Sequence, residues 1–351
     1  MILKQLKYYI SCFLVGIVLV SCASTEESDT IASCEVSFDV RSITRASLTT
    51  SSNITAKPFA VYGDMIHQDL VANNTKRSVV FNGAQVRHNG TNWEYAVGET
   101  QYWFPDHEHS FVALHPGTSF DGLDALKYEN SKLSFTYTLP ENPDDATDIL
   151  MATHRRQYTS REKEPSGTVS FRFAHMTSLV NLAITMNDET HTKKPDEYIE
   201  ITNIKILGFK NKTTYSIAPA SVTSGSQTDD RTDELVNDES SVADYVIDLS
   251  NNPLKIYYNK TAVKLFGDNG LIMLPQSSPG YISMEITYKD IYEGTILELS
   301  AKLSPDWKMG KSYLYSSTIT VDKVGVKWDT SKMAEISNWT TTATTLEHII
   351  E

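Results

Sequence analysis

The densest group of potential metal ligands in this chain is the run Asp106-His107-Glu108-His109. In an extended strand, alternate side chains share a face, so His107 and His109 would point the same way, and paired imidazoles suit zinc or copper. The run directly follows Pro105, however, which is typical of a strand that begins from an exposed turn. We therefore expect a solvated segment here, and no metal or other cofactor.

Sequence motifs with a known catalytic mechanism are missing. Gly310-Lys311-Ser312 matches the end of a phosphate-binding loop, but Pro305 stands where that loop needs its first glycine. His175 lies in an apolar stretch, and no serine or aspartate partner can be assigned to it from the sequence. We expect this histidine to pack in the core, and we predict that the chain is not an enzyme.

A different reactive residue lies near the start of the chain, where Leu19-Val20-Ser21-Cys22 has the form of a bacterial lipobox. Two lysines precede an apolar run from Tyr8 to Val20, which is short for a bilayer core that needs ~20 residues and is typical of a secretory signal. We predict that residues 1–21 are a signal peptide and that acyl chains on Cys22 anchor the protein to the outer membrane. The alternative is a short transmembrane anchor with a chance cysteine.

The segment after the lipobox is small, polar and acidic, with too little apolar content to fold. We predict that residues 22–35 form a lipidated acidic tether. Within it, Asp29-Thr30-Ile31 matches a short O-glycosylation signal with Thr30 as the acceptor. Because Cys12 leaves with the signal and Cys22 is acylated, Cys34 alone can form neither an intramolecular disulfide nor a metal cluster.

The charge of the chain limits its partners. The formal net charge is −13, and it becomes about −15 once Lys4 and Lys7 leave with the signal peptide. Coulomb repulsion then argues against nucleic acids and anionic membrane surfaces as ligands. A mature chain of about 330 residues is long enough to bury one or two cores, which must supply its stability.

Short runs with apolar residues at every second position follow one another along the mature chain. Val36, Phe38 and Val40, for example, alternate with polar residues. Pairs such as Asn82-Gly83 and Asn89-Gly90, which are typical of hairpins or tight loops, separate many of these runs. Strands at this spacing favour an all-β fold of antiparallel β-sandwiches over a parallel α/β sheet.

Two polar segments suggest how the strands are divided. Residues 158–167 are charged and lie near the midpoint, so we predict an N-terminal β-sandwich domain at 36–166 and a C-terminal one at 167–351. Residues 220–241, rich in serine, threonine and acidic residues, are predicted to be a long polar surface loop. A boundary at residues 187–197 is the alternative.

Several segments, taken in their order and spacing, resemble the fimbrillin family, the pilus subunits of Bacteroidales. The segments are Phe59-Ala60-Val61-Tyr62, Tyr102-Trp103-Phe104-Pro105, Phe111-Val112-Ala113-Leu114-His115-Pro116, Asp148-Ile149-Leu150-Met151-Ala152, Val169-Ser170-Phe171-Arg172-Phe173-Ala174-His175, Leu179-Val180-Asn181-Leu182, Leu271-Ile272-Met273-Leu274-Pro275-Gln276, Gly310-Lys311-Ser312-Tyr313-Leu314-Tyr315 and the final tryptophans Trp328 and Trp339. The resemblance implies two transthyretin-like β-sandwich domains in tandem. The chain departs from the family pattern by placing Phe104 between the tryptophan and the proline.

The resemblance gives a special meaning to the stretch from Val36 to Ala46. It implies that an arginine-specific protease cuts between Arg45 and Ala46 and removes the first strand, residues 36–45. Loss of that strand would expose an apolar groove flanked by unpaired backbone groups, which a strand of another subunit could fill. Alternatively, Arg45 is an ordinary surface residue, and the chain is a permanently anchored base subunit.

Taken together, these features predict a structural subunit of a surface pilus or fimbria with a role in adhesion. It would be exported as a lipoprotein precursor to the outer membrane and, after processing, assemble by strand exchange with other fimbrillin-type subunits into a homo- or hetero-polymer. The alternative is an outer-membrane glycan-binding lipoprotein, whereas a secreted hydrolase explains least. Exposed aromatic residues would favour the glycan binder, but core packing is the default expectation for Trp93, Tyr102, Trp103, Trp307, Trp328 and Trp339.

Overall fold

The protein is described here by a computed structural model. The described residues are 35–43, 54–69, 74–96, 98, 100–104, 107–157, 167–188, 197–223, 226–238, 240–258, 261–277, 280–288, 295–303, 305–321, 326–329 and 335–338. Within these ranges the chain consists of β-strands and two short 3-10 helices, η2 (Ile54–Ala56) and η3 (Pro143–Asp145). The predicted all-β class is therefore confirmed.

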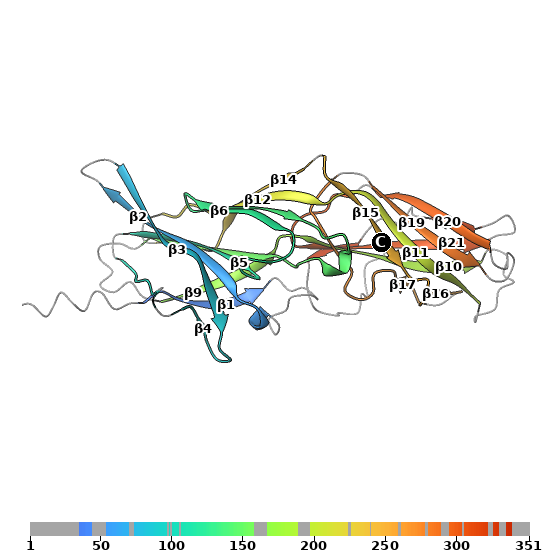
Figure 1. Ribbon diagram of the computed structural model, residues 1–351, viewed down its shortest axis with the longest axis horizontal. Coiled ribbons are helices and arrows are strands. Elements are labelled where there is room, and N and C mark those ends of the chain that lie inside the picture. Colours follow the sequence, from blue (N-terminus) through green and yellow to red (C-terminus); the bar gives the residue numbers. More distant parts are fainter. Residues whose placement is uncertain are drawn as a thin grey trace, which may run out of the picture.

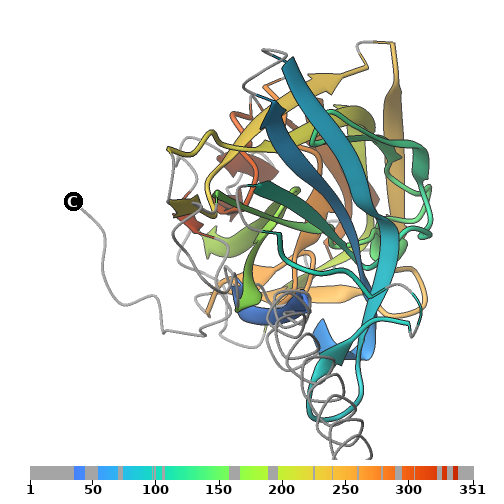
Figure 2. The same ribbon diagram turned by 90° about the vertical axis from the view of Figure 1, so that its left-hand side faces the viewer.

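The first half of the molecule is built on an eight-stranded sheet, called sheet I. Its main path follows the order β1 (Ser37–Ile43), β9 (Thr168–His175), β8 (Leu150–Gln157), β5 (Glu108–His115), β2 (Phe59–Asp69), β3 (Asn74–His88) and β4 (Trp93–Glu94), and β13 (Gln227–Thr228) adds to the end of β8. All neighbours run antiparallel except β1 and β9, which are parallel. The long β2–β3 pair crosses the front of the molecule in Figure 2.

A four-stranded sheet, sheet II, lies along the upper side of the molecule in Figure 1. Its order is β14 (Arg231–Asn237), β12 (Lys212–Pro219), β7 (Lys132–Thr138) and β6 (Leu123–Glu129), all antiparallel. Strand β7 shows why these sequences form strands, because Leu133, Phe135 and Tyr137 are buried while the intervening residues point outward.

Two further sheets make up the other end of the elongated molecule (Figure 1). Sheet III has the order β15 (Val242–Asp248), β11 (Tyr198–Lys210), β19 (Gly280–Tyr288) and β20 (Thr295–Leu303), with β16 (Leu254–Tyr257) also on β11. Sheet IV has the order β17 (Val263–Lys264), β10 (Ser178–Asp188), β21 (Lys311–Val321) and β22 (Val326–Asp329), with β18 (Leu271–Met273) on β10 and β23 (Glu335–Asn338) on β21. The β10–β21 pair is parallel.

The largest core runs between the two ends of the molecule without interruption. It joins Leu114 of sheet I and Phe135 of sheet II to Tyr245 of sheet III and Tyr313 of sheet IV. The hydroxyl of Tyr215 in β12 donates a 2.9 Å hydrogen bond to the carbonyl oxygen of Met176, between β9 and β10. The two ends therefore share apolar packing.

Sheet I is buried on both faces, which explains the apolar run from Phe111 to Leu114 in β5. Val112 and Leu114 belong to the large core, whereas Phe111 and Ala113 belong to a second core on the opposite face. A third core, which includes Ile184, Ile204 and Ile319, lies between sheets III and IV. Val36, directly before β1, and Phe38 of β1 are part of the second core.

The structure corrects the predicted division of the chain in two places. Residues 220–241, predicted to be a loop, contain β13 and β14, and β14 forms an edge of sheet II. Strand β9, which the predicted boundary places in the C-terminal domain, pairs with β8 and β1 of sheet I. Strands β12 and β14 likewise join sheet II beside β7. Sequence periodicity does not show which strands pair, so it could not assign β9 and β12 to their sheets, and the polar β14 has no periodic pattern.

One predicted turn is a bulge instead. Asn82-Gly83 lies inside β3, where Val61 pairs with Ala84 and Tyr62 pairs with Asn82, which leaves Gly83 as an extra residue. Gly83 has a φ of 82°, which favours glycine and is typical of a β-bulge. Asn89-Gly90, by contrast, lies in the turn that connects β3 to β4, as predicted.

Candidate assembly site

Strand β1 closes the seam between β9 of sheet I and the segment Gln101–Tyr102, which follows β4. On one side it pairs in parallel with β9, from Ser37 beside Thr168 to Ile43 beside Phe173. On the other side Glu35 forms a bridge with Tyr102, and the Val36 amide donates a 2.8 Å hydrogen bond to the carbonyl oxygen of Gln101. Figure 1 shows β1 beside β9 and β4 on the underside of sheet I. Strand β1 thus covers the second core.

Phe38 is the central side chain of this seam. Its ring contacts four other rings, at centroid distances of 5.3 to 5.8 Å, in Phe81, Tyr95, Phe111 and Phe171. Only 3% of Phe38 is exposed, and its neighbour Val36 is 1% exposed. Burial of a large apolar side chain stabilises a fold by roughly 1.5–3 kcal/mol. The prediction that the alternating residues of this strand face inward is confirmed for these two.

Polar contacts fix the start and the register of β1. The hydroxyl of Tyr95 donates a hydrogen bond of 2.5 Å to the carbonyl oxygen of Val36. Ser37 and Thr168 share a hydrogen bond of 2.8 Å between their hydroxyl groups. Burial raises the pKa of Tyr95 to about 12, so its hydroxyl keeps its proton through the physiological pH range.

The wall next to β1 is held by Trp103. Its indole Nε1 donates a 3.0 Å hydrogen bond to the carbonyl oxygen of Gly167, the residue before β9. The ring packs edge-on against His109 and Phe111, and the side chain is 3% exposed. Trp103 therefore ties the segment after β4 to the start of β9, so the seam is framed on both sides when β1 is in place.

The predicted modification and cleavage sites lie outside the described residues. This applies to Cys22, to Thr30 and to the Arg45-Ala46 bond. The last residue of β1 is Ile43, two positions before Arg45, and the next described element is η2, which begins at Ile54. Lipidation, glycosylation and cleavage at these positions remain predictions.

The C-terminal strands occupy one edge of sheet IV. Strand β23 pairs with the first part of β21, from Lys311 to Leu314, and β22 pairs with its last part, from Thr318 to Val321. Each is four residues long. Two short edge strands therefore cover β21, whereas a single continuous strand, β10, covers its other side.

The potential metal ligands near residue 107 do not converge within the described part of the chain. Glu108 is paired with Arg155, between Oε1 and Nη2 at 2.5 Å, and the buried His109 packs against Trp103. The ring of His107 lies 4.7 Å from that of His67 in β2, and Asp106 lies outside the described residues. No group of three or more histidine, cysteine or acidic residues suited to a metal occurs among the described residues.

His175 has an acidic partner that the sequence did not reveal. Its Nδ1 lies 2.7 Å from Oδ1 of Asp148, and the two side chains are 0% and 5% exposed. Strand pairing of β8 with β9 places these residues side by side although 27 positions separate them in the sequence. A pair this deeply buried joins β9 to the segment before β8 and is closed to a substrate.

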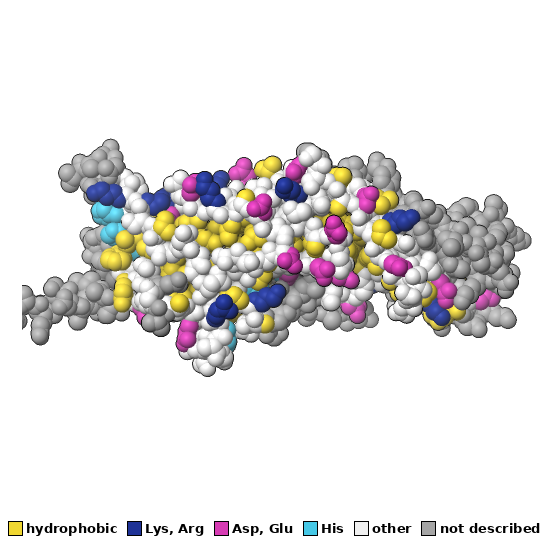
Figure 3. Space-filling model, viewed as in Figure 1, with side chains coloured by type: hydrophobic (Ala, Val, Ile, Leu, Met, Phe, Trp, Pro, Cys, Tyr) yellow, Lys and Arg dark blue, Asp and Glu magenta, His cyan; other side chains and the backbone are white. Residues whose placement is uncertain are grey.

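The aromatic residues are mostly packed, as expected. Trp103 and Trp307 are 3% exposed, and Trp93 is half-buried against Phe59 and His88. Tyr102, at 41% exposure, is the exception among those whose side chains are described. The face seen in Figure 3 carries both basic and acidic side chains, and several acidic ones gather near its middle. No helix among the described residues is long and apolar enough to cross a membrane.

Comparison with known proteins places these features in context. The sequence profile of the fimbrillin-like family matches residues 44–339. No curated protein matches the chain. Three solved structures are similar to it. A candidate cell adhesion protein from Bacteroides uniformis has 19% sequence identity and a TM-score of 0.42, and the match covers 87% of this chain and 99% of that one. Another from Bacteroides ovatus has 12% identity and a TM-score of 0.42, with 82% of this chain and 88% of that one covered, and a fimbrial assembly protein from Parabacteroides distasonis has 9% identity and a TM-score of 0.34, with 86% and 100% covered.

Proposed function

The chain belongs to the fimbrillin-like family, and from that premise we propose that it is a structural subunit of a surface pilus or fimbria with a role in adhesion. In this proposal it has no catalytic activity and consists of two transthyretin-like sandwiches that share a core. It reaches the outer membrane as a lipoprotein precursor acylated at Cys22.

Assembly by strand exchange is the mechanism we propose. The observation that carries it is the position of β1, which closes the seam over the second core and ends two residues before Arg45. Cutting between Arg45 and Ala46 would detach Val36 and Phe38 from that core, together with the backbone hydrogen bonds to β9. The open seam would then present apolar pockets and unpaired backbone groups, a surface that favours addition of a strand.

The donor strand in this proposal is the C-terminal segment beyond Gly325. Its described parts, β22 and β23, are short and pair only with β21, so few interactions would be lost if they left sheet IV. The donor would come from another fimbrillin-type subunit, either a second copy or a related chain. Lipid and protease would act in sequence, because the lipid holds the precursor at the membrane until cleavage removes the residues that carry the anchor.

An arginine-specific protease tests this mechanism on purified full-length protein. We expect cleavage after Arg45, lower thermal stability of the cleaved monomer, and polymers visible by size-exclusion chromatography. Arg45→Ala should stay uncut and monomeric. Arg41→Gln is the matched control, since Arg41 is exposed within β1, and this variant should be cut and polymerise like the wild type.

The wild type could instead be cut at Arg45 and stay monomeric with unchanged stability. A form that lacks the C-terminal segment would then behave in the same way. That result would exclude strand exchange and would favour an anchored glycan-binding lipoprotein.

A further inference from the structure

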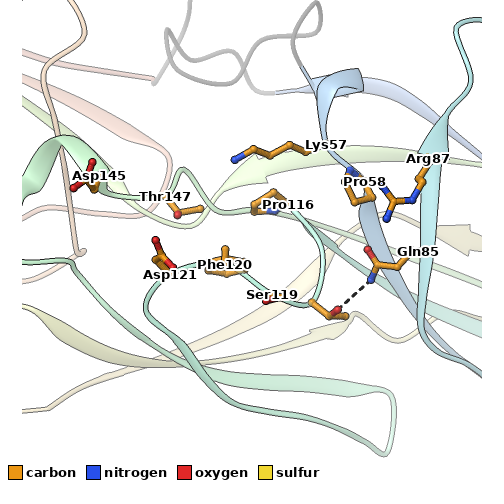
Figure 4. A pocket seen from close by; sticks show the side chains of 11 residues that line it. Lys57, Pro58, Gln85, Arg87, Pro116, Ser119, Phe120, Asp121, Asp145 and Thr147 are labelled. Atoms are coloured by element: carbon orange, nitrogen blue, oxygen red, sulfur yellow. Dashed lines mark hydrogen bonds between the residues drawn. The ribbon is translucent and has the colours of Figure 1, made fainter.

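A pocket of about 730 Å³ opens beside sheet I, away from the seam that β1 fills. It lies between the residues after η2, the end of β3, the loop from β5 to β6, and η3 (Figure 4). Its lining residues are Lys57, Pro58, Gln85, Arg87, Pro116, Thr118, Ser119, Phe120, Asp121, Asp145 and Thr147. This volume is typical of small-molecule sites in proteins.

The charges that line this pocket cancel. Lys57 and Arg87 supply two positive charges, and Asp121 and Asp145 supply two negative ones. Among the described residues, Lys57, Arg87 and Asp121 form no ion pair, whereas Oδ2 of Asp145 accepts a 3.0 Å hydrogen bond from Asn142. These groups are therefore open to a ligand. An anion would meet two carboxylates and a cation would meet two basic groups, so a neutral ligand fits best.

The histidine beneath the pocket adds no charge to it. His115 directly precedes Pro116 and is 4% exposed. Its pKa is lowered to about 4, mainly by burial; the nearby Asp148 partly opposes this effect and Lys57 adds to it. The imidazole is neutral at physiological pH, and the charges of the pocket stay balanced.

The ligand must also have an apolar face. Pro58, Pro116 and Phe120 contribute rings to the lining, and Figure 4 shows Pro116 and Phe120 between the acidic side chains and Gln85. Phe120 is held from behind by Tyr137, with ring centroids 6.0 Å apart. A half-buried aromatic ring of this kind offers one surface to an apolar partner.

One polar side chain of the pocket, Gln85, is held in a fixed position. Nε2 of Gln85 donates to the carbonyl oxygen of Gly83 and to the hydroxyl of Thr118, both at 3.2 Å, and the second bond is drawn in Figure 4. Gly117, at a φ of 100°, lets the Gln85 amide lie close to the loop, because a Cβ there would come within 2.9 Å of its oxygen. A side chain that is held in place before binding loses little freedom when a ligand arrives.

We propose that this pocket binds a neutral saccharide. Sugar hydroxyls both donate and accept hydrogen bonds, so they can accept from Lys57 and Arg87 and donate to Asp121 and Asp145. The C–H face of a pyranose ring matches the strip formed by Pro116 and Phe120. The inference deepens the adhesive part of the proposed function by giving it a chemical class of target, and it does not depend on cleavage or polymerisation.

A glycan array probed with the uncleaved, monomeric full-length chain tests this inference. The array carries neutral oligosaccharides of mannose, galactose and N-acetylglucosamine beside sialylated and sulfated ones, and titration calorimetry with the best neutral oligosaccharide follows. We expect binding to neutral glycans, weakened about tenfold by Asp121→Asn or by Arg87→Gln, since each variant loses one charge-assisted hydrogen bond. Phe120→Ala should weaken it further.

The matched control is Phe104→Ala, which removes an exposed phenylalanine outside the pocket and should bind like the wild type. Phe120 also packs against the core, so the exposed Asp121 and Arg87 variants keep the test valid if Phe120→Ala fails to fold. Three results would overturn the proposal: no binding to neutral glycans, binding to sialylated or sulfated glycans only, or equal binding by Asp121→Asn, Arg87→Gln and the wild type. Because the protein stays uncleaved, a failure here leaves the proposed assembly mechanism untouched.

Discussion

The ring of Phe38 in β1 stacks on the ring of Phe171 in β9, with centroids 5.5 Å apart and planes inclined by 11°. This contact joins β1, which we propose is cleaved away, to β9, which would then pair with the donor strand. The neighbouring Ser37–Thr168 hydrogen bond and the parallel pairing set the register of the two strands. Both packing and register in the seam thus depend on a short stretch of β1.

Replacement of Phe38 by alanine should destabilise the uncleaved protein by about 3–5 kcal/mol, because it leaves a cavity among four aromatic rings. Chemical denaturation, followed by intrinsic fluorescence, measures the change. Arg41→Gln, on the exposed side of the same strand, should change the free energy of unfolding by less than about 0.5 kcal/mol. Equal effects of the two substitutions would show that β1 does not contribute its apolar face to the core.

Two buried histidines should make the stability depend on pH. Burial is the main reason that the pKa of His109 falls to about 3 and that of His115 to about 4, from an ordinary value of 6.5. The unfolded chain therefore binds protons more readily than the folded one below pH 6.5. The stability that each neutral imidazole contributes is present above that pH and is lost as the pH falls toward the folded value.

Urea unfolding at a series of pH values checks this. Below pH 6.5, each histidine should lower the free energy of unfolding by up to about 1.4 kcal/mol per pH unit. His115→Gln should be less stable at neutral pH but should lose stability less steeply on acidification. An unchanged slope in this variant would mean that His115 takes up a proton equally well in both states.

The lipid anchor can be tested with two cysteines that flank the predicted tether. Labelled fatty acid should appear on the wild type and on Cys34→Ser, and it should be absent from Cys22→Ser, because only Cys22 ends the lipobox. Autoradiography of the purified protein gives the result directly. Label that persists in Cys22→Ser would show that the N-terminal segment has been misinterpreted.

The sequence predicted which residues form strands better than it predicted how the strands pair. Alternation identified Val36 and Phe38 as inward-facing, and Leu133 to Tyr137 behaved in the same way. The polar residues of β14 gave no such signal, since the strand lies at an edge of sheet II with most side chains exposed. A polar edge strand and a polar loop have the same composition, and the pairing partner decides between them.

The candidate sites differed in the same way. The contribution of β1 could be predicted because its alternating pattern is local, whereas the His175–Asp148 pair depends on the pairing of β8 with β9. The pocket collects Lys57, Arg87, Phe120 and Asp145 from four separate segments, each without a pattern of its own. Only the fold brings such residues together, so no spacing in the sequence could have indicated the pocket.

Mass spectrometry of the subunit in pili sheared from cells tests most directly whether β1 is replaced during assembly. We predict that the N-terminus in the pili is Ala46 and that no peptide from residues 37–43 is present, whereas the same protein in the membrane of protease-deficient cells begins at an acylated Cys22. Pili whose subunits begin at acylated Cys22 and retain β1 would contradict the account.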